Sequence, residues 1–190
     1  PPRSTLFPYT TLFRSYCEVA AGHPDHGPFH DSEHGYPVRD DALLYERLLL
    51  EINQAGLSWL TVLRKRDNFR RAYAGSDLEK IARFNDQDRA RLMADPGIIR
   101  NRLKIEAAIE NARTLLRLRE EYGGFAQWLD AHHPRELDAW CKLFKKTFRF
   151  TGGEIVNEFL MGVGYLPGAH VADCPIYRKV KKLSPPWARR

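Results

Sequence analysis

Glycine and proline cut this chain into short segments in which apolar residues recur every three or four positions. That period is typical of amphipathic helices. Strand signals are almost absent, and 148-FRF-150 is the only short candidate. We therefore expect an all-α fold of roughly seven to nine short helices. Their expected ranges are 40–55, 58–73, 77–84, 86–94, 101–121, 125–132, 135–146 and 153–164.

The two ends of the chain carry weaker helical signals. Residues 1–15 lack a methionine and contain the near-duplicated strings STLF and TTLF, so we expect a non-native leader and exclude it from functional reasoning. From Tyr16 to Val38 we expect irregular structure, because glycine and proline recur throughout this stretch. Residues 181–190 are read as a basic tail.

Charge and cysteine content limit the classes of function. Lys+Arg 30 against Asp+Glu 24 gives a net charge of +6 among 190 residues, which favours a polyanionic partner such as nucleic acid. Three cysteines are too few for a disulfide scaffold, so we expect a reducing compartment, the cytoplasm of a bacterium. No apolar run approaches ~20 residues, so we expect no membrane-spanning segment.

The stretch 30-HDSEH-34 matches the His-x-x-Glu-His signature of inverted zinc metalloproteases. That motif works on a continuous helix, where the spacing places both histidines and the glutamate on one face. Pro28 precedes the stretch and Gly35 and Pro37 follow it, which argues against such a helix. The peptidase hypothesis is therefore the weaker one.

A second metal hypothesis joins the two ends of the chain. Cys17 and His30 lie in the N-terminal segment, and His170 and Cys174 lie four positions apart near the other end. Two thiolates and two imidazoles form a closed tetrahedral zinc set, which is structural and leaves no position open for substrate. The alternative is that the cysteines are isolated thiols and the histidines are solvated surface groups.

Four stretches taken together resemble one family of DNA repair enzymes. They are FHDSEHGYPV, LLLEINQAGLSWLTVLRKRDNFRRAY, DPGIIRNRLKIEAAIENA and HVADC, in that order from Cys17 to Cys174. The chain is thereby similar to the type I 3-methyladenine-DNA glycosylases. The resemblance implies a helix–hairpin–helix fold, with residues 16–180 forming one domain of two helical lobes around a cleft.

The resemblance also implies site residues and a cofactor. Cys17, His30, His170 and Cys174 fall on the family's positions for one structural zinc ion per chain. Glu51 and Trp59 fall on the base-recognition positions. Such a site suits an alkylated base, since electron-rich rings and one buried carboxylate hold a cationic ring and discriminate it from normal adenine.

Each proposed pocket residue also has a plainer interpretation. Trp59 could be a core residue, and Glu51 could pair with Arg47 at helical spacing. Phe29 lies beside His30 and could form a second wall of the pocket or simply pack. Their joint placement within the family motif favours the functional interpretation.

The block 95-DPGIIRNRLKI-105 is a turn that leads into the longest expected helix. Gly97, Arg100, Arg102 and Lys104 are its candidate DNA-binding residues, since amides at a helix start and added cations attract phosphate. A merely solvated basic face would have the same sequence. The basic runs 64–71 and 142–150 are interpreted as ordinary surface.

Some positions depart from the family pattern. Val19 and His34 stand where the family usually has tryptophan, and Phe29 stands where it usually has tyrosine, so we expect a differently shaped pocket. We find neither a catalytic aspartate nor a Schiff-base lysine. The prediction is a monomeric, monofunctional enzyme that removes 3-methyladenine from double-stranded alkylated DNA and leaves an abasic site. The alternative is a non-catalytic, zinc-containing DNA-damage-binding module.

Overall fold

The structure is a computed structural model that describes residues 15–189, so most of the expected leader lies outside the described residues. Within this part of the chain there are α-helices and two short 3-10 helices but no β-strand, which confirms the all-α expectation. The 148–150 segment is a bend rather than a strand. The helices are α1 (Tyr16–Ala20), α2 (His26–Ser32), α3 (Asp41–Gln54), α4 (Trp59–Ala72), η1 (Ala74–Ser76), α5 (Leu78–Ala82), α6 (Asp86–Ala94), α7 (Arg102–Tyr122), α8 (Phe125–His132), α9 (Leu137–Thr147), α10 (Gly153–Gly162), α11 (Pro175–Lys182) and η2 (Pro186–Ala188).

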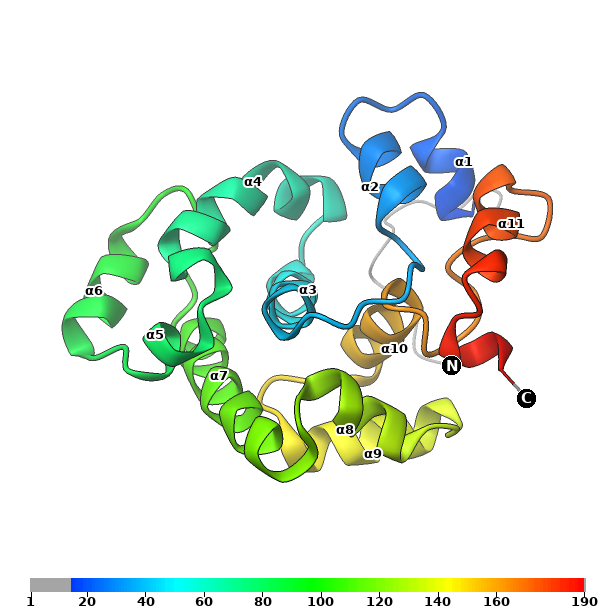
Figure 1. Cartoon of the computed structure of the whole chain (residues 1–190). Coiled ribbons are helices and arrows are strands. Elements are labelled where there is room, and N and C mark those ends of the chain that lie inside the picture. Colours follow the sequence, from blue (N-terminus) through cyan, green and yellow to red (C-terminus); the bar gives the residue numbers. More distant parts are fainter. Residues whose placement is uncertain (1–14, 190) are drawn as a thin grey trace.

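Helix α3 is the centre of the fold. Figure 1 shows it nearly end-on, with α4, α7, α8 and α10 packed around it. Its sequence explains this position, because Leu44 and Leu48 lie on one face of the helix, Leu50 lies on another, and all three are buried. A helix that is apolar on several sides is stable only when other elements cover those sides. Residues near its C-terminal end therefore face the interior of the protein.

The expected helix boundaries are reproduced where the sequence carries a capping residue. The side chains of Asp40, Ser58 and Asn101 accept hydrogen bonds from the first turns of α3, α4 and α7. Gly123, at a φ of 90°, ends the 21-residue helix α7. These local signals set the ends of the helices that carry the candidate site.

The expectation of irregular structure from Tyr16 to Val38 is wrong in part, since α1 and α2 lie within it. Pro28 is compatible with α2 because it occupies the first turn, where a backbone N–H would have no helical partner. Helix α11 was also missed, and Pro175 is accepted at its start for the same reason. The number of short helices therefore exceeds the expected range.

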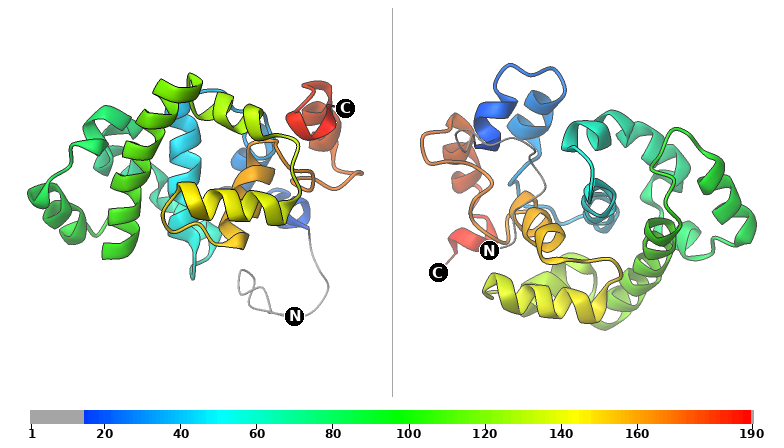
Figure 2. Two further views of the ribbon diagram at one scale, coloured as in Figure 1. Left: turned by 90° about the horizontal axis from the view of Figure 1, so that it is seen from below. Right: turned by 180° about the vertical axis from the view of Figure 1, so that it is seen from behind.

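Helices from the two ends of the described chain lie side by side. In Figures 1 and 2 the pair α1–α2 stands next to α11, although more than a hundred residues separate them in sequence. The small core between them includes Cys174, Ile176 and Val180, with Cys17 packed against it. None of the helices between residues 15 and 189 has the length and apolar character needed to cross a membrane.

Candidate metal centre and base-binding cavity

Cys17, His30, His170 and Cys174 form one cluster, as the spacing hypothesis expected. Their ligand atoms all lie within 4.8 Å of one another. Nδ1 of His170 is 3.1 Å from Nε2 of His30, and each imidazole has a thiol sulfur at 3.7 Å. The edges of a tetrahedron of zinc ligands measure about 3.4–3.8 Å at ordinary zinc–nitrogen and zinc–sulfur bond lengths. The donor set and its spacing therefore fit a tetrahedral zinc ion.

The remaining ring nitrogens of the two histidines are also satisfied. Nδ1 of His30 donates to the Asp31 carboxylate at 2.7 Å, and Nε2 of His170 donates to the His34 carbonyl at 2.8 Å. These bonds fix the tautomers so that the other nitrogen of each ring presents its lone pair to the cluster. Burial lowers the pKa of His170, which favours the neutral imidazole that a metal requires.

Gly35 allows the chain to pass close to the cluster. Its φ is +79°, and a Cβ at this position would lie 2.8 Å from the Ala169 Cβ and 3.2 Å from the His170 ring. Its N–H donates to the Gly162 carbonyl at 2.8 Å. A glycine is therefore required both by the backbone conformation and by the space available.

The structure argues against the peptidase interpretation of HDSEH, as the sequence did, because no continuous helix carries the whole motif. Helix α2 does include His30, but it ends at Ser32, before the last two residues of the motif. The Glu33 carboxylate is held by Arg47 and Arg66, so it is not free to act as a base. His34 contributes no ligand atom to the cluster.

A cavity of about 350 Å³ lies beside the metal cluster. Helices α1 and α2, the α3–α4 connection, α10 and the segment before α11 all contribute to its walls. The side chains of Phe29, Glu51 and Trp59, named from the sequence, all line it. A cavity of this size holds a small planar ligand, and its walls are mostly apolar with a few polar groups. The complete lining is Ser15, Tyr16, Cys17, Val19, His26, Phe29, His34, Glu51, Gln54, Ser58, Trp59, Leu60, Glu158, Met161, Gly168, Ala169 and Val171.

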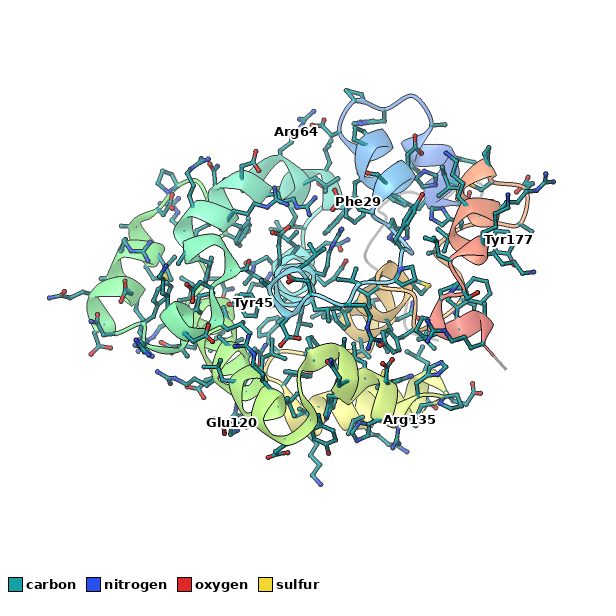
Figure 3. The ribbon with its side chains drawn as sticks, viewed as in Figure 1. Phe29, Tyr45, Arg64, Glu120, Arg135 and Tyr177 are labelled. Atoms are coloured by element: carbon teal, nitrogen blue, oxygen red, sulfur yellow. The ribbon has the colours of Figure 1, made fainter. Side chains whose placement is uncertain are left out.

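Phe29 connects the metal cluster to the cavity. It precedes His30 on α2, and Figure 3 shows it on the side of that helix that faces α3 and α4. Its ring centroid lies 5.1 Å from that of Trp59, with the ring planes at 62°. The Arg47 guanidinium lies 4.7 Å from the centroid of the Phe29 ring. A change at His30 would therefore move one aromatic wall of the cavity.

Glu51 lies in the last turns of α3, with its carboxylate at the cavity. Burial, together with the charge of Glu158, raises its pKa to about 8, although the charge of Arg47 acts in the opposite direction. The pairing with Arg47 that helical spacing allowed does not form, because Arg47 binds Glu33 instead. Among residues 15–189, Glu51 thus has no cationic partner, and it lies at the edge of an aromatic cavity.

Three further cavity residues did not emerge from the sequence. Tyr16 and His26 belong to the segment that was read as irregular, so no helical pattern placed them. Glu158 carries a weaker signal than Glu51, because α10 also contains the polar residues Glu154 and Asn157.

The candidate DNA-binding residues separate into two groups. Arg100 and Arg102 are exposed at the start of α7, and Gly97 lies in the turn before it. Lys104 departs from the expectation, because it is only 5% exposed and its ammonium group donates to the carbonyls of Asn53 and Ala55. Lys104 therefore holds the α3–α4 connection and is not available for phosphate.

Known proteins share this sequence and fold. Residues 19–138 match the family model described as methyladenine glycosylase. DNA-3-methyladenine glycosylase 1 of Escherichia coli is 36% identical over 85% of this chain and 96% of its own length. DNA-3-methyladenine glycosylase of Haemophilus influenzae is 35% identical over 77% of this chain and 89% of its own length.

Solved structures agree with this comparison. The 3-methyladenine DNA glycosylase I from Staphylococcus aureus, in a structure described as the basis of 3-methyladenine recognition, superposes with a TM-score of 0.76 at 32% identity. The match covers 85% of this chain and 95% of that one. A variant of 3-methyladenine DNA glycosylase I in complex with 3-methyladenine gives a TM-score of 0.78 at 32% identity, over 85% and 96% of the two chains.

Proposed function

The chain belongs to the methyladenine glycosylase family, and we propose that it is a DNA repair glycosylase that removes 3-methyladenine from alkylated DNA. The observation that carries the proposal is the single cavity lined by Phe29, Glu51 and Trp59. A base methylated at a ring nitrogen is cationic while it is attached to the sugar. Two aromatic faces and a carboxylate without a cationic partner suit such a ring.

The reaction is a hydrolysis of the N-glycosidic bond. Water adds to the anomeric carbon of the deoxyribose as the carbon–nitrogen bond breaks, and the bonding electron pair leaves with the base. That pair neutralises the positive charge of the base, and the water loses one proton, which leaves an abasic site and free 3-methyladenine. Because the leaving group is already activated, the residues mainly hold the extruded base and stabilise its charge. Glu51 supplies the negative charge, and Phe29 and Trp59 hold the ring.

The metal centre supports this function without taking part in the reaction. We propose that Cys17, His30, His170 and Cys174 hold one structural zinc ion. A closed set of four protein ligands leaves no coordination position for substrate. Its role is to hold α1 and α2 against the segment before α11 and so to fix Phe29 at the cavity.

The DNA-binding element is proposed to be the turn at 95–101 and the start of α7, a hairpin of the helix–hairpin–helix type. Arg100 and Arg102 are exposed there and would contact phosphate. Gly97, the third candidate, allows the turn to pack closely against Asn68, and its N–H donates to the Asp95 carboxylate. We propose double-stranded DNA as substrate and a monomeric protein, with residues 16–180 as its one domain.

Release of free base from a duplex rich in 3-methyladenine tests the function. We expect the wild-type protein to release 3-methyladenine and Glu51→Gln to release it at least ~100-fold more slowly, about the loss that removal of one key electrostatic contact produces. A folded wild-type protein that binds methylated duplex and releases no base would instead support the non-catalytic damage-binding module. The names of the relatives favour the glycosylase over that module.

A further inference from the structure

Glu158 is the second carboxylate of the base-binding cavity. It lies on α10, which packs directly against α3, and it lines the same cavity as Glu51. Figure 1 shows the two helices next to each other at the centre of the molecule. Glu51, Gln54, Glu154 and Glu158 also line a small neighbouring cleft, so Glu51 and Glu158 lie at the same end of the base-binding cavity.

No residue in the described part of the chain neutralises either carboxylate. Among residues 15–189, no ion pair involves Glu51 or Glu158. Burial and the charge of Glu154 raise the pKa of Glu158, and the charge of Glu158 in turn raises that of Glu51. A buried carboxylate whose ionisation is disfavoured by a neighbouring acidic group costs stability when it is charged, unless a cation joins it.

Glu158 differs from other glutamates of this chain, and the difference argues against a merely structural role for Glu158. Glu46 and Glu33 are partly or fully buried as well, but each is bound by two arginines. Glu154, one turn earlier on α10, is exposed to solvent, where a carboxylate costs nothing. Glu158 is partly buried and lies on the wall of an aromatic cavity, and no arginine or lysine among residues 15–189 pairs with it.

We propose that Glu158 is a specificity-determining residue that acts with Glu51 to select bases carrying a fixed positive charge. This inference rests on the proposed function and deepens it. A cationic ring between the aromatic walls gains attraction from both carboxylates, whereas neutral adenine gains none and leaves the acidic pair uncompensated. With both carboxylates, the difference in affinity between damaged and normal bases is larger than it would be with Glu51 alone.

The test compares two small ligands of nearly the same shape. The 3,9-dimethyladeninium ion is a permanent cation, and 9-methyladenine is its neutral counterpart without the 3-methyl group. Calorimetric titration of the wild type and of Glu158→Gln with each ligand gives the ratio of cation affinity to neutral affinity. Glu121→Gln is the control, because it removes the same charge at an exposed position on α7 that does not line the cavity.

We expect Glu158→Gln to weaken binding of the cation by about 5- to 20-fold, which is typical of losing one partly shielded charge interaction, and to leave 9-methyladenine unchanged. Glu121→Gln should change neither affinity, and Glu158→Asp should retain most of the preference for the cation. An unchanged affinity ratio in Glu158→Gln overturns the inference, and so does an equal loss for both ligands, which would indicate a structural role.

The outcome is separable from that of the proposed function. Release of 3-methyladenine from methylated duplex by the wild type is measured in parallel. If the wild type releases no base, the function fails. If the wild type is active and Glu158→Gln keeps the same affinity ratio and the same kcat/KM, the role of Glu158 alone is refuted.

Discussion

Nδ1 of His170 lies 3.1 Å from Nε2 of His30, although 140 positions separate the two residues in sequence. The second nitrogen of each ring is held by a different partner, the Asp31 carboxylate for His30 and the His34 carbonyl for His170. The two imidazoles are therefore oriented toward one point, and Cys17 and Cys174 complete the donor set around it. The relationship ties the first helices of the described chain to the segment before α11.

The first prediction is that Cys174→Ser loses zinc. Wild-type protein purified without chelators should contain about one zinc per chain, and the variant should contain close to none and unfold at a lower temperature, because metal binding and folding of this region are coupled. Metal analysis and thermal unfolding measure both. Cys141→Ser is the control, since Cys141 lies outside the cluster. A Cys174→Ser protein that still holds one tightly bound zinc would exclude this ligand set.

Gly35→Ala should also disturb the metal centre. Its added Cβ meets Ala169 at 2.8 Å and the His170 ring at 3.2 Å, in a backbone conformation that already disfavours side chains. We expect a loss of about 2–4 kcal/mol in the free energy of unfolding and weaker zinc retention.

Gly75→Ala separates the effect of a positive φ from the effect of the close contact that an added Cβ makes at Gly35. Gly75 has a φ of +67° but no atom within 4 Å of an added Cβ, so its variant should lose only the ~1 kcal/mol of backbone strain and keep zinc. Equal effects of both substitutions on zinc content and on unfolding in urea would show that the close approach at Gly35 has no consequence.

How much the sequence predicts depends on whether the signal is local. The expected starts at 40 and 58 agree with the observed starts of α3 and α4, because the caps Asp40 and Ser58 are encoded within four residues of them. Helix α2 is not predicted, because Pro28 indicates a helix break. A proline is compatible with the first turn of a helix, and the sequence does not show that α2 begins two residues before Pro28. Glu51 was found because a glutamate in an apolar run requires an explanation. Glu158 has Asn157 and Glu154 near it on α10, so only the packing of α10 against α3 brings it to the cavity.

The environment of Lys104 depends on residues that are distant in sequence. Its place near the start of a basic helix favoured an exposed phosphate contact. It is one turn before Ala108 and two turns before Asn111, however, and both are buried on the inward face of α7. The carbonyls that receive its ammonium group belong to the end of α3, and nothing in the sequence near Lys104 indicates them.

This placement gives opposite predictions for Lys104 and Arg102. Lys104→Met leaves the Asn53 and Ala55 carbonyls without their donor, so we expect a loss of about 1–3 kcal/mol in stability. The α3–α4 connection should loosen and lower kcat/KM for base release. Arg102→Ala should leave stability unchanged and weaken binding of undamaged duplex. The slope of the logarithm of the binding constant against the logarithm of the salt concentration should fall by about the value of one phosphate contact. Unfolding in urea and DNA binding at several salt concentrations measure the two effects. If Lys104→Met weakened DNA binding without loss of stability, Lys104 would be a DNA contact after all.

Glu33 should be a structural residue and not a catalytic one. Burial alone would raise its pKa, but hydrogen bonding to Arg66 and the charges of Arg47, Arg66 and Arg70 outweigh burial and lower it. The folded pKa lies below the unfolded value, so the stabilisation is present above about pH 4.5 and is lost as the pH falls through the folded pKa.

We therefore expect Glu33→Gln to cost about 2–4 kcal/mol at pH 7, because two arginines lose a buried partner, and less at acidic pH. Per folded molecule, base release should stay within about threefold of wild type, a change too small for the loss of a catalytic group. The measurements are denaturant unfolding at two pH values and kcat of the folded fraction. A selective loss of kcat without loss of stability would assign Glu33 to the reaction.

The last prediction is that Glu51→Gln removes activity and raises stability at alkaline pH. The pKa of Glu51 is about 8 in the folded protein against an ordinary value of 4.5, because burial and Glu158 disfavour its ionisation more than Arg47 favours it. Between these values the folded state holds a proton that the unfolded state has released. Wild-type stability therefore falls as the pH rises from about 4.5 through 8, and glutamine, which does not titrate, escapes this loss.

We expect the variant to be more stable than the wild type by about 1–3 kcal/mol at pH 9 and indistinguishable from it at pH 4. In the wild type, kcat/KM should rise with pH through about 8 as the free enzyme ionises Glu51, and the residual activity of the variant should lack that rise. Urea titrations at pH 4, 7 and 9 and a pH series of base release test both parts. A variant that is less stable at pH 9 would mean that the Glu51 carboxylate already has a partner within the folded chain. In that case it could not be held ready for a cationic base, since its ionised form would be stabilised before any ligand arrives.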